Sequence, residues 1–190
     1  MSQEKIRCFI AFDINDEAIL TRLGEAQEQL VKTGADLKLV EVKNIHVTLR
    51  FLGEITPQLI DLVYEEMKMV KFPLFDIELR GLGVFPNLRH PNVVWVGIKK
   101  GAEELEGIFA QLEPRLRMLR LQPDTRGFSP HITIARVKSG RSKMELTTQI
   151  TQMENLEFGI VKADALRLKK SILTPKGPIY LTLHEVRPQT

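Results

Sequence analysis

The sequence predicts an α+β protein whose two halves repeat one arrangement of antiparallel strands and helices. Apolar residues recur with a period of two in some segments and at helical spacing in others, and strand-like segments follow one another along the chain. One short motif also occurs twice: histidine, apolar residue, threonine, apolar residue, at 46–49 and at 131–134. No linker or low-complexity run divides the chain, so residues 1–190 are expected to form a single domain.

The order of the elements follows from this periodicity and from local start and stop signals. Asn15 or Asp16 can cap the first helix and Gly34 can end it, while Thr56 is a cap followed by Pro57 at the first helical position. The expected elements are a strand at 7–14, a helix at about 17–32, a short strand at 37–40, a motif strand within 44–54, a helix at 57–70, strands at 75–80 and 93–98 joined by a bend at 81–86, a helix at about 102–119, a motif strand within 128–137, a weaker helix at about 142–153, and strands at 158–169 and 179–186.

Three single residues have an expected structural role. Pro114 lies inside the third helix and should kink or split it, because proline removes a backbone donor. Trp95 stands in an apolar strand, which favours a place in the core over a base-stacking role. Cys8 alternates with other apolar residues, which indicates a packed thiol rather than a nucleophile.

The repeated motif has a clear geometric meaning in a strand. Side chains two residues apart point to the same face, roughly 6.5–7 Å apart. His46 and Thr48 therefore share one face, and Val47 and Leu49 turn to the buried one. His131 and Thr133 form the equivalent pair.

The composition sets bounds on location and partners. The hydrophobic content of 43% and charged content of 27% are those of a globular protein, and no apolar run is long enough to span a membrane. The single cysteine fits a reducing cytoplasm, and the start of the chain does not look like a signal peptide. The net charge of +3 permits an anionic partner without demanding one.

Two histidine–threonine pairs facing each other would suit chemistry at a phosphodiester. One imidazole can activate the nucleophile while the other protonates the leaving oxygen, and the hydroxyls can hydrogen-bond the phosphate. This set needs no metal or cofactor. Neither histidine is favoured as acid or as base by the residues alone.

Other readings fit the residues less well. A zinc site would need ligands beyond the two histidines, at a spacing that the sequence lacks. A serine nucleophile has no supporting motif. A non-catalytic module that binds RNA ends or nucleotides stays open as the alternative function.

Basic and aromatic residues flank both motifs. They form either a solvated face or a contact surface for an RNA backbone, and Phe128 either stacks on a base or packs in the core. The candidate RNA contacts are Arg50, Arg126, Phe128 and Arg136, with Lys43, Lys138, Arg141 and Lys143 nearby. His90 and His184 lack the threonine and are expected on a surface loop and in the last strand.

The two motifs and their flanks resemble the two-histidine phosphoesterases. The closer resemblance is to the branch of 2′-5′ RNA ligases, also called RNA 2′,3′-cyclic phosphodiesterases. It rests on the phrases at 7–13, 46–54 and 128–136, on 94–97, and on 171–173 with 180–181.

The resemblance implies a bilobal α+β fold with two pseudo-symmetric antiparallel sheets around a central cleft and helices outside. It implies hydrolysis of an RNA 2′,3′-cyclic phosphate to a 2′-phosphate, with 2′-5′ ligation of ends such as those of tRNA halves as the reverse reaction. His46 would be the proton donor and His131 the proton acceptor, with Thr48 and Thr133 binding phosphate. We expect a cytoplasmic monomer that needs no cofactor.

Overall fold

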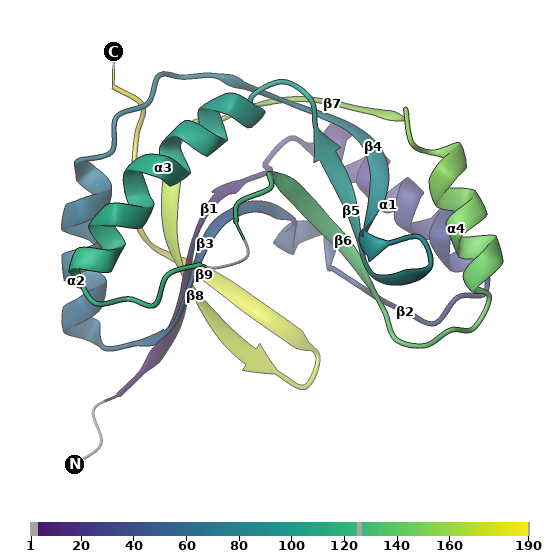
Figure 1. Cartoon of the computed structure of the whole chain (residues 1–190), viewed down its shortest axis with the longest axis horizontal. Coiled ribbons are helices and arrows are strands. Elements are labelled where there is room, and N and C mark those ends of the chain that lie inside the picture. Colours follow the sequence, from purple (N-terminus) through teal and green to yellow (C-terminus); the bar gives the residue numbers. More distant parts are fainter. Residues whose placement is uncertain (1–3, 125–126, 190) are drawn as a thin grey trace.

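The chain forms two antiparallel sheets with helices on their outer sides (Figure 1). The computed structural model describes residues 4–124 and 127–189. The four-stranded sheet has the order β3-β1-β8-β9 and contains β1 (Ile6–Asp13), β3 (His46–Ile55), β8 (Leu166–Thr174) and β9 (Gly177–Val186). The five-stranded sheet has the order β2-β6-β5-β4-β7 and contains β2 (Leu37–Leu39), β4 (Asp76–Asn87), β5 (His90–Ile98), β6 (His131–Val137) and β7 (Glu157–Lys162). The α+β class and the antiparallel pairing are confirmed.

Two helices each cover the sheet that does not contain the strand before them. The helices are α1 (Glu17–Lys32), α2 (Pro57–Lys68), α3 (Ala102–Met118) and α4 (Lys143–Gln152), and a short 3₁₀ turn at Val42–Asn44 precedes β3. Helix α1 follows β1 but packs against β6, β7 and α4, whereas α3 follows β5 but packs against β3 and α2. We call the four-stranded sheet with α2 and α3 the first lobe, and the five-stranded sheet with α1 and α4 the second lobe (Figure 1).

Local signals in the sequence place the helix starts. The Asp16 carboxylate accepts a hydrogen bond of 2.9 Å from the Ile19 backbone N–H at the start of α1. The Thr56 hydroxyl does the same for Leu59 at 3.3 Å, with Pro57 at the first position of α2. Both caps satisfy donors that the helix itself leaves free, as the sequence predicts.

Cys8 is buried at 1% exposure on β1. Its burial raises the pKa of the thiol to about 11, partly opposed by the charge of Lys170. The thiol is therefore protonated at neutral pH, which agrees with the predicted packing role.

The expectation of a bend at 81–86 is wrong. Strand β4 continues to Asn87, and Gly81 forms a bulge with a positive φ between Arg80 and Leu82. A Cβ on Gly81 would lie 2.2 Å from the Glu154 carbonyl oxygen, so glycine admits the close approach of the chain there. The glycine therefore changes the register within a strand instead of ending it.

Two further expectations are corrected. The segment 158–169 is not one strand: β7 ends at Lys162 in the second lobe, and β8 begins at Leu166 in the first. Helix α3 is continuous from Ala102 to Met118, so it is not split at Pro114, and a kink there stays a prediction. The carbonyl that Pro114 leaves without a helical partner belongs to Ala110, which is exposed, so water can take the place of the missing donor.

Among the described residues, no helix is long and apolar enough to cross a membrane.

Candidate functional site

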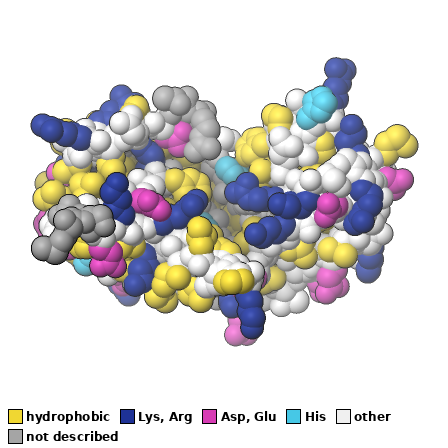
Figure 2. Space-filling view, turned by 90° about the horizontal axis from the view of Figure 1, so that it is seen from below, with side chains coloured by type: hydrophobic (Ala, Val, Ile, Leu, Met, Phe, Trp, Pro, Cys, Tyr) yellow, Lys and Arg dark blue, Asp and Glu magenta, His cyan; other side chains and the backbone are white. Residues whose placement is uncertain are grey.

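The two motif strands belong to different sheets but contact each other. Strand β3 lies at the edge of the first sheet and touches β6 of the second (Figure 1). Figure 2 shows a hollow between the two halves of the molecule, with a histidine visible in it and lysine and arginine side chains beside it. The fold thus brings together segments that are far apart in the sequence.

Both motifs alternate as the sequence predicts. On β3, His46 and Thr48 are half-buried, whereas Val47 and Leu49 are buried at 0% and 3% exposure. On β6, His131 and Thr133 are half-buried and Ile132 is buried. We call the face with the histidine and threonine the site face of each sheet.

Each motif strand carries a bulge directly after its threonine. On β3, Thr48 pairs with Ala11 and Arg50 pairs with Ile10, so Leu49 is an extra residue. On β6 the extra residue is Ile134, between Thr133 and Ala135. Such a bulge reverses the alternation that follows it, because one residue is left out of the pairing.

The two histidines are held in the same way. Their Nδ1 atoms lie 2.7 Å from the carbonyl oxygens of Asn44 and Ser129, two residues earlier in each strand. A carbonyl can only accept, so each Nδ1–H donates and each Nε2 is left for chemistry. This matched tautomer gives the site two equivalent proton-transfer atoms.

Both imidazoles have a lowered pKa. Burial is the main cause at His46; the positive charge of Lys169 adds to it, while the Asn44 carbonyl and the Asp13 carboxylate oppose it. Burial also lowers the pKa of His131, opposed by its bond to the Ser129 carbonyl. In the free protein both rings are therefore neutral at pH 7.

Aromatic rings frame both histidines. The His46 ring lies 4.9 Å from that of Phe9 and 5.3 Å from that of Tyr180. The His131 ring lies 4.9 Å from Phe85, which meets it edge-on. These contacts restrict the orientation of each imidazole.

Trp95 lies among these aromatic rings beside His131 and not in the core, which corrects the sequence expectation. It is the register partner of Thr133, and its ring lies 6.5 Å from that of His131. A Cβ on Gly83 would come within 2.2 Å of the indole, so the glycine makes room for the ring. A glycine in the neighbouring strand is thus the sequence signal that points to this placement.

Sequence reasoning missed a group of charged side chains on the first sheet. Asp13 is the register partner of His46 and forms an ion pair with Lys169. Arg167 lies 3.6 Å from the same carboxylate and pairs with Asp164 at 3.0 Å. Arg167 and Lys169 alternate with the buried Leu168, and that period of two was the available signal.

Arg50 does not lie where an RNA contact needs it. It is 6% exposed and pairs with Glu113 of α3 at 2.8 Å. It also donates to the backbone carbonyls of Phe51 and Gln122. The bulge at Leu49 turns it inward, so its expected role on the surface is wrong.

The other residues expected to contact RNA differ in where they lie. Arg136 is exposed and lies on the site face of β6, after the bulge at Ile134. Phe128 stacks on Phe109 of α3 at 4.8 Å, which favours the packing role over base stacking. Arg126 lies outside the described residues.

Most of the other basic residues near the motifs already have partners. Lys43 forms an exposed ion pair with Glu41. Arg141 and Lys143 donate to the backbone carbonyls of Gly34 and Arg89, which ties the segment after β6 to its neighbours. Lys138 is exposed directly after β6.

The remaining histidines lie away from this chemistry. His90 is exposed at the start of β5, next to the tight connection from β4 rather than in a longer loop. His184 is in the last strand, as predicted, and stacks on Tyr64 of α2 at 4.2 Å.

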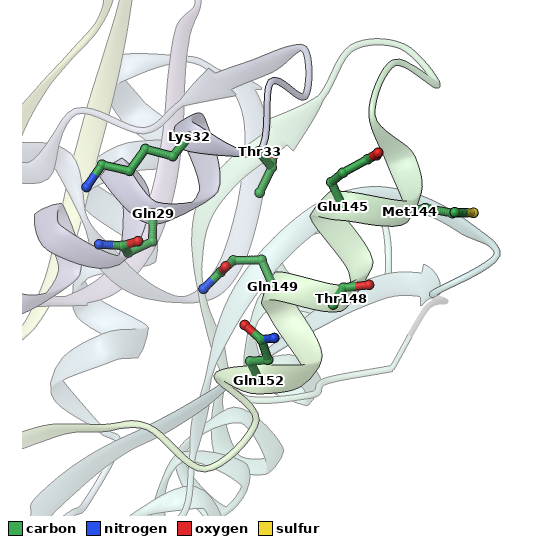
Figure 3. Close-up of a pocket in the computed structure, with 8 residues that line it drawn as sticks. All are labelled: Gln29, Lys32, Thr33, Met144, Glu145, Thr148, Gln149 and Gln152. Atoms are coloured by element: carbon green, nitrogen blue, oxygen red, sulfur yellow. The ribbon is translucent and has the colours of Figure 1, made fainter.

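A separate groove of about 460 Å³ lies between α1 and α4, outside the second sheet (Figure 3). Most of the residues that line it are of polar or charged types, and none of the predicted site residues contributes to it. Across 4–124 and 127–189, no three His, Cys, Asp or Glu side chains come together in a way that could hold a metal ion.

Comparison with known proteins places this geometry in a family. The model of the LigT-like phosphoesterases matches twice, at residues 14–95 and 96–180, so the duplication inferred from the motifs extends along the chain. An RNA 2′,3′-cyclic phosphodiesterase of Aeropyrum pernix is 42% identical over 166 residues, covering 87% of this chain and 94% of the relative.

Solved structures agree in fold. A Thermus thermophilus protein superposes with a TM-score of 0.77 at 27% identity, covering 96% of this chain and 97% of that one. Escherichia coli LigT in complex with 3′-AMP superposes with a TM-score of 0.82 at 21% identity, over 98% of this chain and 100% of that one. With the family model matching both halves of the chain, one motif strand in each, this protein belongs to the LigT-like phosphoesterase family.

Proposed function

We propose that this protein is an RNA 2′,3′-cyclic phosphodiesterase that opens a terminal cyclic phosphate to a 2′-phosphate. The observation that carries the proposal is the matched pair of histidines, with identical Nδ1 hydrogen bonds, on two motif strands that contact each other. The Aeropyrum pernix relative bears the name of this activity and aligns along most of both chains.

The reaction follows from the two imidazoles. Nε2 of His131 takes a proton from water, and the water oxygen attacks the phosphorus. The reacting form is the one in which His46 is an imidazolium, with a second proton on Nε2. The bond from phosphorus to the 3′ oxygen breaks, and His46 gives this Nε2 proton to that oxygen, which leaves a 3′-hydroxyl, a 2′-phosphate and a neutral His46. The assignment of His46 as donor follows the family resemblance.

Thr48 and Thr133 act on the charge that develops on the phosphate. Each hydroxyl lies on the same strand face as its histidine, two residues away. Donation to the non-bridging oxygens stabilises the transition state more than the ground state, because the charge on those oxygens grows. Proton transfer and charge stabilisation are both covered by side chains, so the mechanism is metal-independent.

Both lobes are needed for this mechanism. Each lobe supplies one histidine and one threonine, so residues 1–190 act as one two-lobed domain. The substrate is RNA with a 2′,3′-cyclic phosphate end. The same site working in reverse would join such an end to a 5′-hydroxyl through a 2′-5′ bond, as in tRNA halves.

The test is product analysis on an oligoribonucleotide with a 2′,3′-cyclic phosphate end, in the presence of EDTA. We expect a 2′-phosphate product, and losses in turnover of about 10²–10⁴-fold for His46→Ala and for His131→Ala. Thr48→Val and Thr133→Val should cost about 10–10³-fold.

Three results would go against the proposal. Loss of activity in EDTA would point to a metal-dependent reaction. Full activity in either histidine variant would exclude the pair. RNA binding that survives both histidine changes, without any turnover in the wild type, would favour a binding module.

A further inference from the structure

Two arginines on the strands of the two sheets differ from the other strand arginines in their surroundings. Arg50, Arg80 and Arg167 each pair with a carboxylate, at 2.8 Å, 3.3 Å and 3.0 Å. Within the described residues, neither Arg7 on β1 nor Arg136 on β6 forms an ion pair, although Glu54 is the cross-strand neighbour of Arg7. In the described part of the chain, their charges are therefore not neutralised by a carboxylate.

Arg7 lies on the site face of the first sheet. It is two residues before Phe9, so the two side chains share a face of β1. The Phe9 ring contacts those of His46 and Tyr180, each at 4.9 Å. Tyr180 is itself 5.3 Å from His46, so this corner of the first lobe adjoins the reacting centre.

Arg136 lies on the site face of β6, in the second lobe. The bulge at Ile134 turns it to the site face, where Lys38 of β2 is its register partner. Burial raises the pKa of the Tyr180 hydroxyl, and the positive charges of Arg7 and Arg136 act in the opposite direction. Both guanidinium groups are thus within electrostatic reach of one hydroxyl, and Figure 2 shows Lys and Arg side chains gathered beside the hollow.

Cations drawn from both lobes and left without an acid partner suit an anionic ligand. Like charges held close together repel each other, and an anion between them removes that cost. A guanidinium can also bind two phosphate oxygens at once, and the Tyr180 hydroxyl can donate to a third.

We propose that Arg7, Arg136 and Tyr180 bind a backbone phosphate of the RNA, separate from the phosphate that reacts. This inference rests on the proposed function. In an RNA that ends in a cyclic phosphate, the 2′ and 3′ oxygens of the last nucleotide are both taken, so the chain continues only through its 5′ oxygen. The bound group is therefore a phosphodiester on the 5′ side of the cyclic end, and the site selects RNA chains over free cyclic nucleotides.

The experiment compares two substrates that share the same terminal nucleoside: a nucleoside 2′,3′-cyclic phosphate and a short oligoribonucleotide with that end. The variants are Arg7→Ala and Arg136→Ala. The matched control is Lys68→Ala, which removes one positive charge from an exposed ion pair on α2.

For each arginine variant, kcat/KM should fall at least about tenfold more on the oligonucleotide than on the nucleotide, mainly through KM. The slope of log KM against log salt for the oligonucleotide should become less steep by about 0.7 for each phosphate that the protein no longer neutralises. Arg136→Lys should restore most of the salt dependence, and Lys68→Ala should behave as the wild type on both substrates.

Two results would overturn the inference. Equal losses on both substrates would place the arginines at the reacting phosphate, and wild-type behaviour of both variants would make them a solvated surface. If the wild type hydrolysed neither substrate, the proposed function would fail by itself. Fluorescence anisotropy with a labelled RNA bearing a 2′-phosphate would then still test the inference about the arginines. The inference requires Arg7→Ala and Arg136→Ala to bind this RNA more weakly than Lys68→Ala does.

Discussion

At the scale of single residues, His46 and His131 make the same kind of hydrogen bond but have different surroundings. Each donates Nδ1–H to the carbonyl two residues earlier. His46 also lies beside a charged pair, that of Lys169 with Asp13, whereas burial and the Ser129 carbonyl set the pKa of His131. Two copies of one motif have thus come to differ electrostatically, and that difference can be measured.

We expect kcat/KM to be bell-shaped in pH, with its maximum below pH 6.5. Burial lowers the pKa of both imidazoles from the ordinary value of 6.5, so the pH range in which one is protonated and the other neutral moves to lower pH. Steady-state kinetics with a nucleoside 2′,3′-cyclic phosphate across the pH range would check this.

Lys169→Met is the matched variant for this profile. The substitution removes the positive charge of Lys169, which lowers the pKa of His46. One limb of the bell-shaped pH profile of kcat/KM should therefore move to higher pH. Lys170→Met, the neighbour in β8, should leave the profile in place. A wild-type maximum above pH 7 would contradict the assignment of the two imidazoles as the titrating pair.

At the scale of elements, the bulge after each motif decides what the rest of the strand does. On β3 it turns Arg50 inward, where the side chain joins the strand to α3 through Glu113 and to the loop after α3 through the Gln122 carbonyl. On β6 it places Ala135 inward and leaves Arg136 on the site side. The same irregularity therefore gives a structural arginine in one lobe and an exposed one in the other.

Arg50→Met should destabilise the protein by about 3–5 kcal/mol, because it leaves the Glu113 carboxylate buried without its main partner. Burial raises the pKa of Glu113, but hydrogen bonds from Arg50 and Arg117 outweigh it and lower the pKa overall. The stabilisation is therefore present above the unfolded-state pKa of glutamate and is lost as the pH falls through the folded-state value. Urea unfolding at neutral and acid pH would measure both effects.

Two controls bound this prediction. Lys43→Ala breaks the exposed pair with Glu41 and should cost at most about 1 kcal/mol. Replacing Arg50 and Glu113 together with apolar residues should cost less than Arg50→Met, since no charge is then left buried. A cost below about 1 kcal/mol for Arg50→Met would show that Glu113 finds another partner.

At the scale of the whole molecule, the exchange of helices joins the lobes. Helix α1 leaves the first sheet and covers the second, and α3 makes the opposite crossing. The chain crosses again between β7 and β8, and it ends in the first sheet. Neither half of the sequence contains all of either lobe, so the duplication did not yield two separable units.

We therefore expect one cooperative unfolding transition for both lobes. Trp95 is the only tryptophan and lies in the second sheet, so its fluorescence reports on that lobe, while far-UV circular dichroism reports on the helices of both. The two urea transitions should coincide in midpoint and slope. Separate midpoints would mean that the lobes unfold independently and that the single-domain prediction is wrong.

Local patterns in the sequence were sufficient for most elements and for the central pair of motifs. The cap at Asp16 and the cap at Thr56 act through hydrogen bonds that span three residues, so their helices could be placed without any knowledge of the fold. The faces of His46 and Thr48 follow from the alternation of a strand, which is equally local. These features depend on neighbours in the chain and were predicted correctly.

What the tertiary structure decided lies in contacts between distant segments. The break between β7 and β8 depends on which sheet each strand joins, and the inward turn of Arg50 depends on a register set by β1. The place of Trp95 on the site face depends on Gly83 in the neighbouring strand, and the meeting of β3 with β6 depends on how the sheets pack. The sequence by itself determined which residues could do the chemistry; the fold decided which of them meet, because strand register and sheet packing are set by long-range contacts that local periodicity does not encode.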